Sequence, residues 1–293
     1  MSRLFLIAGG ALLVQACTVV VAGDDQQCSA DVDCADRGFV NAVCAEQVCI
    51  EDEEIIVTDP VWGCLGNVEE PTPDLTKTVS FDVRLAYAVS GAAVSTDTVI
   101  DVCEKLDPNC TANSPDFPKG LNPDPNGVVE LTVKEGFDGF VKITGASPDV
   151  LVDSRVYVGR PIVEIPTVEE IQLFAPIDLQ ALASTAMQTP DPTRGTAIVL
   201  IQDCSGDGVG GVRFETPAAD SDTLEFYLIN QFPTPPPEAT TTDADGFGGF
   251  FNVPVGPSVM RAFRDEDDTY VGESSYQILA DTISYVLVAP TPQ

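Results

Sequence analysis

The sequence predicts an exported all-β protein with two tandem antiparallel β-sandwich modules and one short helix between them. Many short β-rich runs, separated by Pro and Gly turns, fill the chain from residue 75 onward, and only one stretch has helical periodicity. An apolar segment near the N-terminus is followed by several cysteines, and the chain has nine in all, which is typical of an oxidising compartment. At 293 residues, the chain is long enough for two domains of ordinary size.

The composition excludes several classes of function. Fourteen Lys and Arg against 46 Asp and Glu give a formal net charge of -32 at pH 7. A chain this acidic repels phosphate backbones, so we expect no nucleic-acid partner. The sequence contains no histidine, which removes Ser-His-Asp and Cys-His nucleophiles and His-ligated zinc. We therefore expect a non-enzymatic protein without a cofactor.

Residues 1–16 are predicted to be a signal peptide. Arg3 precedes an apolar run over residues 4–14, and small residues then lead to Cys17. Residues 14–17 (VQAC) resemble the lipobox of bacterial lipoproteins, with Val at the position where Leu is commoner. The resemblance implies that the Cys17 thiol is acylated, that Cys17 becomes the mature N-terminus, and that the lipid makes the membrane a partner.

The residues around Cys17 also bear on location. Thr18 follows Cys17 in place of Asp. By resemblance to the sorting rule of enterobacterial lipoproteins, this implies the outer membrane or cell surface, with residues 17–27 as anchor and tether. One alternative is a membrane-spanning anchor over residues 4–23, which carry no charge and are about long enough. Another is ordinary cleavage after Ala22, which would leave a soluble protein.

A small cysteine-rich module is predicted over residues 28–50. Eight cysteines remain beside Cys17, an even number that favours four disulfides in an exported protein. The first four have the spacing C-x5-C-x9-C-x4-C, without the repeated C-x2-C of zinc sites. A segment this short needs such cross-links, because it cannot bury a core of its own. It resembles the cysteine-rich modules that follow the anchor of myxobacterial surface lipoproteins, and also Dickkopf-type segments. Three connectivities are open, of which we favour Cys28–Cys44 with Cys34–Cys49.

A linker over residues 51–74 and a first sandwich over residues 75–166 come next. The acidic run at residues 51–54 is interpreted as a solvated spacer. Residues 79–87 alternate with period two, which predicts a strand with one buried face. The buried face is expected to carry Val79, Phe81, Val83, Leu85 and Tyr87. Further strands are expected at residues 128–133, 140–144, 155–158 and 162–165.

A connector over residues 167–193 and a second sandwich over residues 194–293 complete the chain. Residues 178–187 predict the only helix, with Asp178 as its N-cap. Its apolar stripe is expected to pack on the second sandwich and comprises Leu179, Leu182, Ala183 and Ala186. Strands are expected at residues 197–201, 212–215, 224–229, 250–253, 258–263, 275–279 and 283–288.

Two turns indicate that the sandwiches are duplicates. Residues 124–127 (DPNG) and 243–246 (DADG) each lead into an apolar strand, which is followed by a glycine and a further apolar strand. The spacing of these features differs by one residue between the two copies. Residues 242–256 resemble the hairpin of carboxypeptidase regulatory-like, or transthyretin-like, sandwiches, and a weaker version covers residues 75–166. The resemblance implies an immunoglobulin-like sandwich without catalytic residues.

Four cysteines lie outside the small module. Cys103 and Cys110 are close enough in sequence to close a small loop. Cys64 and Cys204 would then join the linker, or the first sandwich, to the second.

Other binding hypotheses rest on loops and aromatic residues. Asp265, Asp267 and Asp268 are the candidates for a calcium site, although the regular alternation and closing Glu of an EF-hand are absent. Trp62 is the only tryptophan, whereas a carbohydrate-binding face would normally show several aromatic residues. Forty-six acidic residues provide carboxylate pairs by chance, so their abundance does not indicate a hydrolase.

The expected function is that of a lipid-anchored cell-envelope protein, whose sandwiches serve binding, adhesion or scaffolding towards an unknown protein or glycan ligand. The alternative is an exported module that binds peptide or carbohydrate, with or without stabilising calcium. A hydrolase that uses a carboxylate pair comes third.

Overall fold

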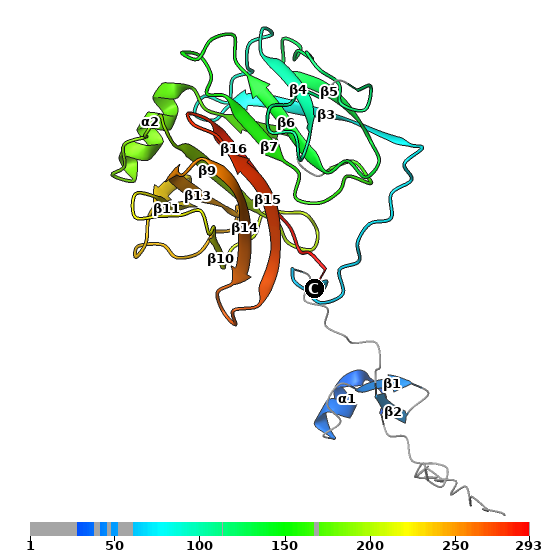
Figure 1. Ribbon diagram of the computed structural model, residues 1–293. Helices are drawn as coiled ribbons and strands as arrows, with labels where there is room; N and C mark the ends of the chain where they lie inside the picture. The colour runs from blue at the N-terminus through cyan, green and yellow to red at the C-terminus, as the bar shows by residue number, and fades with distance from the viewer. Residues whose placement is uncertain are drawn as a thin grey trace, which may run out of the picture. The chain divides into compact units, whose positions relative to one another are not determined.

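The chain forms two compact units, residues 1–58 and 59–293 (Figure 1). The computed structural model describes residues 28–37, 42–45, 48–51, 61–112, 114–166 and 170–292. The predicted signal peptide and Cys17 lie outside the described residues. Within the described part, no helix is both long and apolar enough to cross a membrane.

The smaller unit consists of a short helix and a hairpin. Its elements are α1 (Asp31–Asp36), β1 (Ala42–Ala45) and β2 (Val48–Glu51), and the two strands pair antiparallel. Disulfides join Cys28 to Cys44 and Cys34 to Cys49, which is the connectivity that the sequence favours. The cross-links tie the helical segment to the hairpin twice, as a unit with so little apolar material requires.

The larger unit is almost entirely β-structure, which confirms the predicted fold class. Its first half contains β3 (Thr78–Tyr87), β4 (Val99–Glu104), β5 (Val128–Lys134), β6 (Gly139–Thr144), β7 (Ser154–Tyr157) and β8 (Glu170–Leu173). Its second half contains α2 (Pro176–Thr185), β9 (Gly195–Ile201), β10 (Val212–Glu215), β11 (Leu224–Ile229), β12 (Phe232–Thr234), β13 (Phe247–Val253), β14 (Gly256–Arg264), β15 (Tyr270–Ile278) and β16 (Ile283–Val288).

The two halves repeat one strand arrangement. In the first repeat (residues 73–173), β5-β3-β8 form one sheet and β4-β6-β7 lie side by side in the facing sheet. In the second repeat (residues 190–288), β13-β9-β16 and β10-β14-β15 take the same places, while β11 and β12 extend the first of these sheets beyond β13. In both repeats the last strand runs parallel to the first, as β8 does beside β3 and β16 beside β9.

The same short motif precedes each repeat. Residues 73–77 (PDLTK) and 190–194 (PDPTR) stand directly before β3 and, in the second repeat, before β9. In each, the Asp Oδ1 accepts hydrogen bonds from the backbone amide and the hydroxyl of the Thr two residues on. Each Asp also forms an ion pair with the Lys or Arg that closes the motif. Sequence, hydrogen bonding and strand order therefore agree that the halves are duplicates.

A parallel pairing of β7 with β16 joins the repeats into one sheet. The resulting sheet has eight strands in the order β12-β11-β13-β9-β16-β7-β6-β4 (Figure 1). Strands in its middle are covered on both faces, so residues 154–157 are all buried. Near-continuous apolar runs such as AIVLI and ISYVLV are typical of strands buried in this way. The sequence predicts antiparallel sheets, and these parallel pairs are the difference that the structure introduces.

Two hydrophobic clusters lie on opposite faces of the eight-stranded sheet. The first fills the sandwich of the first repeat and continues to α2, whose Leu179 and Ala183 are buried. The second fills the sandwich of the second repeat. Alternate residues of one strand serve the two clusters, as Tyr285 and Val286 of β16 do.

Several local expectations fail, among them that of a single helix, since α1 is a second one. The N-cap of α2 is Ala175, without a side-chain hydrogen bond, because Pro176 begins the helix and places Asp178 within its first turn. Residues 162–165 form a single bridge between Ile162 and Phe137 followed by a bend, where a strand was expected. Pro161 and Pro166 enclose this segment and cannot donate to a ladder. The sequence also gave no sign of β4, β8 and β12.

Candidate functional site

An apolar pocket of about 280 Å³ opens into the sandwich of the first repeat. One wall comes from the sheet β5-β3-β8 and the other from the eight-stranded sheet. Most wall residues are aliphatic and buried, and include Val83, Leu131, Val133, Val141, Val156 and Ile171, while Phe81, Phe137 and Tyr157 add aromatic rings to the lining. A pocket of this kind is the usual form of a small-ligand site, with size near the lower end of that class.

The parallel strands explain why loops from distant parts of the sequence meet at this pocket. β7, β16 and β9 run in one direction side by side, so their carboxyl ends lie at the same edge. Residues 158–166 follow β7, and residues 202–206 follow β9. Both segments line the pocket, together with Leu287 and Ala289 at the end of β16.

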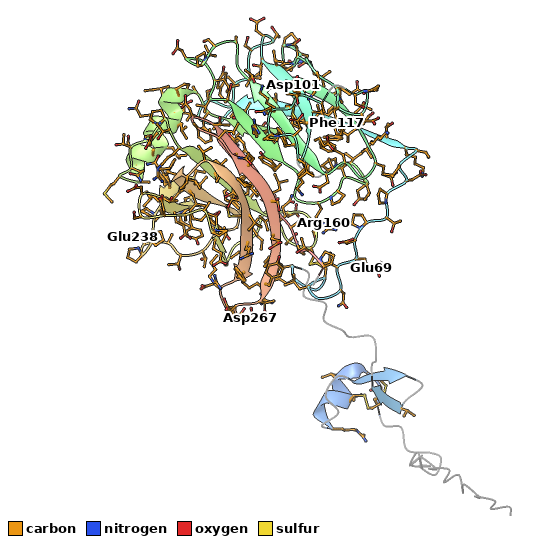
Figure 2. The ribbon with its side chains drawn as sticks, viewed as in Figure 1. Glu69, Asp101, Phe117, Arg160, Glu238 and Asp267 are labelled. Atoms are coloured by element: carbon orange, nitrogen blue, oxygen red, sulfur yellow. A yellow bond between two sulfur atoms is a disulfide. The ribbon has the colours of Figure 1, made fainter. Side chains whose placement is uncertain are left out.

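Polar side chains lie among the residues that follow these strands. Arg160 is exposed and donates a hydrogen bond from Nη1 to the Pro290 carbonyl at 3.2 Å (Figure 2). Asp203 accepts hydrogen bonds from the amides of Ser205 and Asp207, so its carboxylate is engaged within its own loop. Glu164 is exposed. The pocket therefore combines apolar walls with a polar edge.

The disulfide between Cys64 and Cys204 reinforces this edge. Cys204 lies in the loop after β9 and is held further by a hydrogen bond from its amide to the Val61 carbonyl at 3.1 Å. Trp62 packs against the second hydrophobic cluster, with the Arg264 guanidinium 6.0 Å from its ring centre. The loop is thus tied to a segment 140 residues earlier in the chain.

The second repeat has aromatic rings where the first repeat has its pocket. Leu131 lies four residues after the turn glycine Gly127, and Phe250 lies four residues after the equivalent Gly246. The Phe250 ring packs edge-on against Phe214, with centroids 5.5 Å apart. Phe214 packs in turn against Tyr227 at 4.7 Å. On the neighbouring strand, Leu131 lies opposite Phe81 and Phe250 lies opposite Ala197, so the two interiors differ in where their rings are placed.

The calcium candidates form the tip of the β14–β15 hairpin, where Figure 2 labels Asp267. Arg264 forms ion pairs with Glu266 and Asp267, while Arg213 pairs with Asp268. Hydrogen bonds from the Thr269 side chain and amide lower the pKa of Asp267. The structure therefore gives Asp267 and Asp268 arginine partners, and Asp265 donates its amide to the Gly211 carbonyl.

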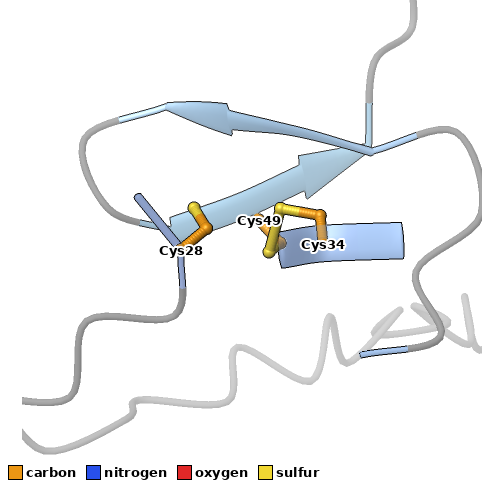
Figure 3. A group of neighbouring side chains, drawn as sticks. All are labelled: Cys28, Cys34 and Cys49. Atoms are coloured by element: carbon orange, nitrogen blue, oxygen red, sulfur yellow. A yellow bond between two sulfur atoms is a disulfide. The ribbon is translucent and has the colours of Figure 1, made fainter. Parts of the chain in front are cut away.

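The eight remaining cysteines form four disulfides. Cys103 pairs with Cys110 and Cys64 with Cys204, the pairings expected from the sequence. Sulfur atoms of Cys28, Cys34 and Cys49 lie within 4.8 Å of one another (Figure 3). Two adjacent disulfides account for this proximity, and a disulfide sulfur is not the thiolate that binds zinc.

The two carboxylates whose pKa is raised, among the described residues, lie away from the pocket. Burial raises the pKa of Asp153, and burial likewise raises that of Glu225, which accepts a hydrogen bond from the Tyr227 hydroxyl at 2.5 Å. Neither carboxylate lines the pocket. Arg155 is almost fully buried beside the Phe140 ring, and its Nη1 has no hydrogen-bond partner in the described part of the chain.

The sequence reasoning did not identify the pocket or Arg160. The available signal was the pair of prolines around residues 162–165, which indicates an irregular segment within a β-rich run. Because a strand was predicted at residues 162–165, the sequence did not indicate that these residues line a pocket.

A scan against protein-family models gave no match, and a search of curated proteins gave none either. Among solved structures, the chain is similar to the Bacillus anthracis TIE protein at 12% identity and a TM-score of 0.22. The match covers 72% of this chain and 33% of that one, so this chain spans about a third of its length.

Two further solved structures show a similar degree of likeness. For a Streptococcal ancillary pilin the identity is 14% and the TM-score 0.23, with 73% of this chain and 69% of that chain covered. For CBMbc of family CBM26 from Eubacterium rectale Amy13K, in complex with maltoheptaose, the identity is 9% and the TM-score 0.24, with coverages of 73% and 93%. Likeness at these TM-scores carries no argument about function.

Proposed function

We propose that the chain is a non-enzymatic, exported protein of the bacterial cell envelope that is anchored through a lipid on Cys17 and uses the pocket of the first repeat to bind an apolar ligand. The pocket is the observation that carries the binding function. Close packing is the rule in protein cores, and in the second repeat the rings of Phe214, Tyr227 and Phe250 lie in contact with one another.

The export and anchoring parts of the proposal rest on the N-terminal sequence and the disulfides. Disulfides persist outside the reducing cytosol, and the chain has four. The lipobox-like residues 14–17 supply the anchor, and the acidic linker would act as a spacer. The closer resemblance to myxobacterial lipoproteins and carboxypeptidase regulatory-like sandwiches remains a prediction.

A ligand that stacks on aromatic faces is the less favoured alternative. Among the exposed large hydrophobic side chains of the described residues, Phe232 is the only aromatic one. Carbohydrate recognition depends largely on exposed aromatic rings. The aliphatic pocket therefore favours a hydrocarbon group over a sugar.

The binding function is tested with a neutral apolar fluorescent probe, N-phenyl-1-naphthylamine. We expect the probe to bind with enhanced fluorescence, and Leu131→Phe to weaken binding at least fivefold by extending a ring into the pocket. Phe232→Leu, on the exposed β12, is the matched control and should bind as the wild type does. Equal binding by Leu131→Phe and the wild type would place the probe elsewhere and remove the basis of the proposal.

The anchor is tested by intact mass and membrane fractionation of the protein expressed in a Gram-negative host. A mature chain beginning at Cys17 with added acyl mass, lost from the membrane in Cys17→Ala, is the expected result. An unacylated soluble product beginning near Gly23 would contradict it.

A further inference from the structure

We infer that the ligand of this pocket is an unbranched aliphatic chain of roughly ten carbons that ends in a carboxylate, with Arg160 as the residue that binds the carboxylate. The inference rests on the proposed binding function and adds the chemical class of the ligand.

The walls of the pocket select a hydrocarbon chain. Val83, Leu131 and Val133 from one sheet face Val141 and Val156 from the other, and none of these side chains has a hydrogen-bonding group. A buried polar group of a ligand would lose its water here without gaining a partner. Methylene groups lose no hydrogen bonds on entry.

The volume of the pocket limits the length of that chain. A dry cavity of about 150 Å³ lined by similar residues accepts benzene, which has six carbon atoms. In proportion, about 280 Å³ holds roughly ten carbon atoms. Longer chains would leave their additional methylenes in water.

Arg160 supplies an anion-binding group beside the pocket. Residues 59–293 contain 12 Lys and Arg against 36 Asp and Glu. Eight of these 12 cations form ion pairs with carboxylates. Arg160 is not among them, and within the described residues it donates one hydrogen bond, from Nη1 to the Pro290 carbonyl. Most of its guanidinium donors therefore remain available for a carboxylate, which this planar group binds in bidentate fashion.

The net negative charge of the larger unit opposes the binding of an anionic ligand only weakly, because charges beyond the screening length contribute little. At physiological ionic strength, charges further than about 8 Å apart are largely screened. Asp203 directs a carboxylate oxygen to the amides of its own loop, and Glu164 is an exposed residue of the pocket lining. An adjacent guanidinium thus outweighs the distant negative charges.

Two ligand series test the inference by displacement of N-phenyl-1-naphthylamine. In the first, affinity should rise roughly fourfold per methylene from hexanoate to decanoate and then level off near dodecanoate. In the second, decanoate should bind more tightly than decanol, and decylammonium more weakly than both. A rise that continues unchanged through hexadecanoate would contradict the length limit, because detergent-like adsorption to the surface behaves in this way.

Arg160→Gln provides the decisive variant. We expect decanoate to bind five- to tenfold more weakly to it, and decanol to bind as it does to the wild type. Arg261→Gln removes an exposed arginine that is paired with Glu273 and does not line the pocket, and should alter neither affinity.

The outcomes separate the two levels of the proposal. If no alkyl compound displaces the probe, the binding function itself fails. If decanol and decanoate bind equally and Arg160→Gln changes neither, the pocket binds apolar ligands but the carboxylate inference is wrong. Tighter binding of decylammonium than of decanoate would show that the acidic field prevails over Arg160.

Discussion

The two repeats of the larger unit share a strand order and the short motif before their first strand (residues 73–77 and 190–194, here called the entry motifs), but they differ in what fills them. The first has mostly aliphatic walls and a pocket of about 280 Å³, whereas in the second the rings of Phe214, Tyr227 and Phe250 pack tilted and edge-on against one another. A single topology therefore does not determine whether a sandwich contains a binding site. The volume of a few inward-facing side chains determines it.

The difference can be located at equivalent positions. Val129 and Leu131 follow the turn glycine of the first repeat by two and four residues, and Gly248 and Phe250 do so in the second. Gly248 leaves room for the ring of Phe214, which would lie 2.5 Å from a Cβ at that position. In the second repeat, Phe250 thus packs against the Phe214 ring, for which Gly248 leaves space, and these rings fill the core.

The largest effect is expected from the two disulfides of the larger unit, of which one joins the second repeat to the segment before the first repeat and the other lies within the first. Cys64–Cys204 closes a loop of 140 residues, and Cys103–Cys110 closes one of seven. In the chain-entropy model, replacing both cysteines by Ala costs about 5 kcal/mol for the first and about 2 kcal/mol for the second. Denaturant unfolding without reductant measures both. Equal losses would show that local strain or packing, rather than loop length, decides the contribution.

The second largest loss of stability is expected when a ring is removed from the core of the second repeat. Phe214→Ala removes the ring that packs on Tyr227 and Phe250, and we expect a loss of about 4 kcal/mol in the free energy of unfolding. Phe232→Ala is the control, because that ring is exposed and its loss should change stability by less than about 0.5 kcal/mol. A loss below about 1 kcal/mol for Phe214→Ala would mean that the second interior is as loosely packed as the first.

A matched pair of enlarged side chains measures the packing difference directly. Val133→Leu adds a methylene at the pocket, where there is space, and should change stability by less than about 0.5 kcal/mol. Val199→Leu makes the same change in the filled second core and should cost about 1–3 kcal/mol. Thermal unfolding of the two variants side by side gives the comparison. The same cost at both sites would contradict the distinction between a hollow and a filled repeat.

Strand positions were largely predictable from the sequence because period two and β-branched residues depend on local burial. The range predicted at residues 283–288 is that of β16, and residues 212–215 are β10. β8 was missed although β10, which is equally short, was predicted, and β12 was missed because it contains a proline. The second entry motif at residues 190–194 was visible in the sequence and would have strengthened the inference of a duplication.

Strand pairing and the pocket could not be predicted in the same way. Periodicity indicates which face of a strand is buried but not which strand lies beside it, so the parallel contact of β7 with β16 left no local signal. The pocket depends on that contact, since it brings the ends of β7, β9 and β16 together. Arg160 acquires its position only through this arrangement.

The smallest expected effect concerns pH and the entry motifs. The Arg194 guanidinium, with help from nearby amide and hydroxyl donors, lowers the pKa of Asp220 from 3.8 to about 2. A pKa that is lower in the folded state stabilises the protein fully above the unfolded value, and this contribution is lost as the pH falls through the folded value.

The advantage of the wild type over Asp220→Asn should therefore be constant above about pH 5 and shrink between about pH 4 and 2. Asp74→Asn, at the first entry motif, should show a weaker trend, because hydrogen bonds from Thr76, followed by Lys77, lower the pKa of Asp74, whereas the Arg194 guanidinium is the main cause at Asp220. Thermal unfolding of both variants between pH 2 and 7 measures this, and a flat difference for Asp220→Asn would mean that Arg194 does not hold this carboxylate in solution.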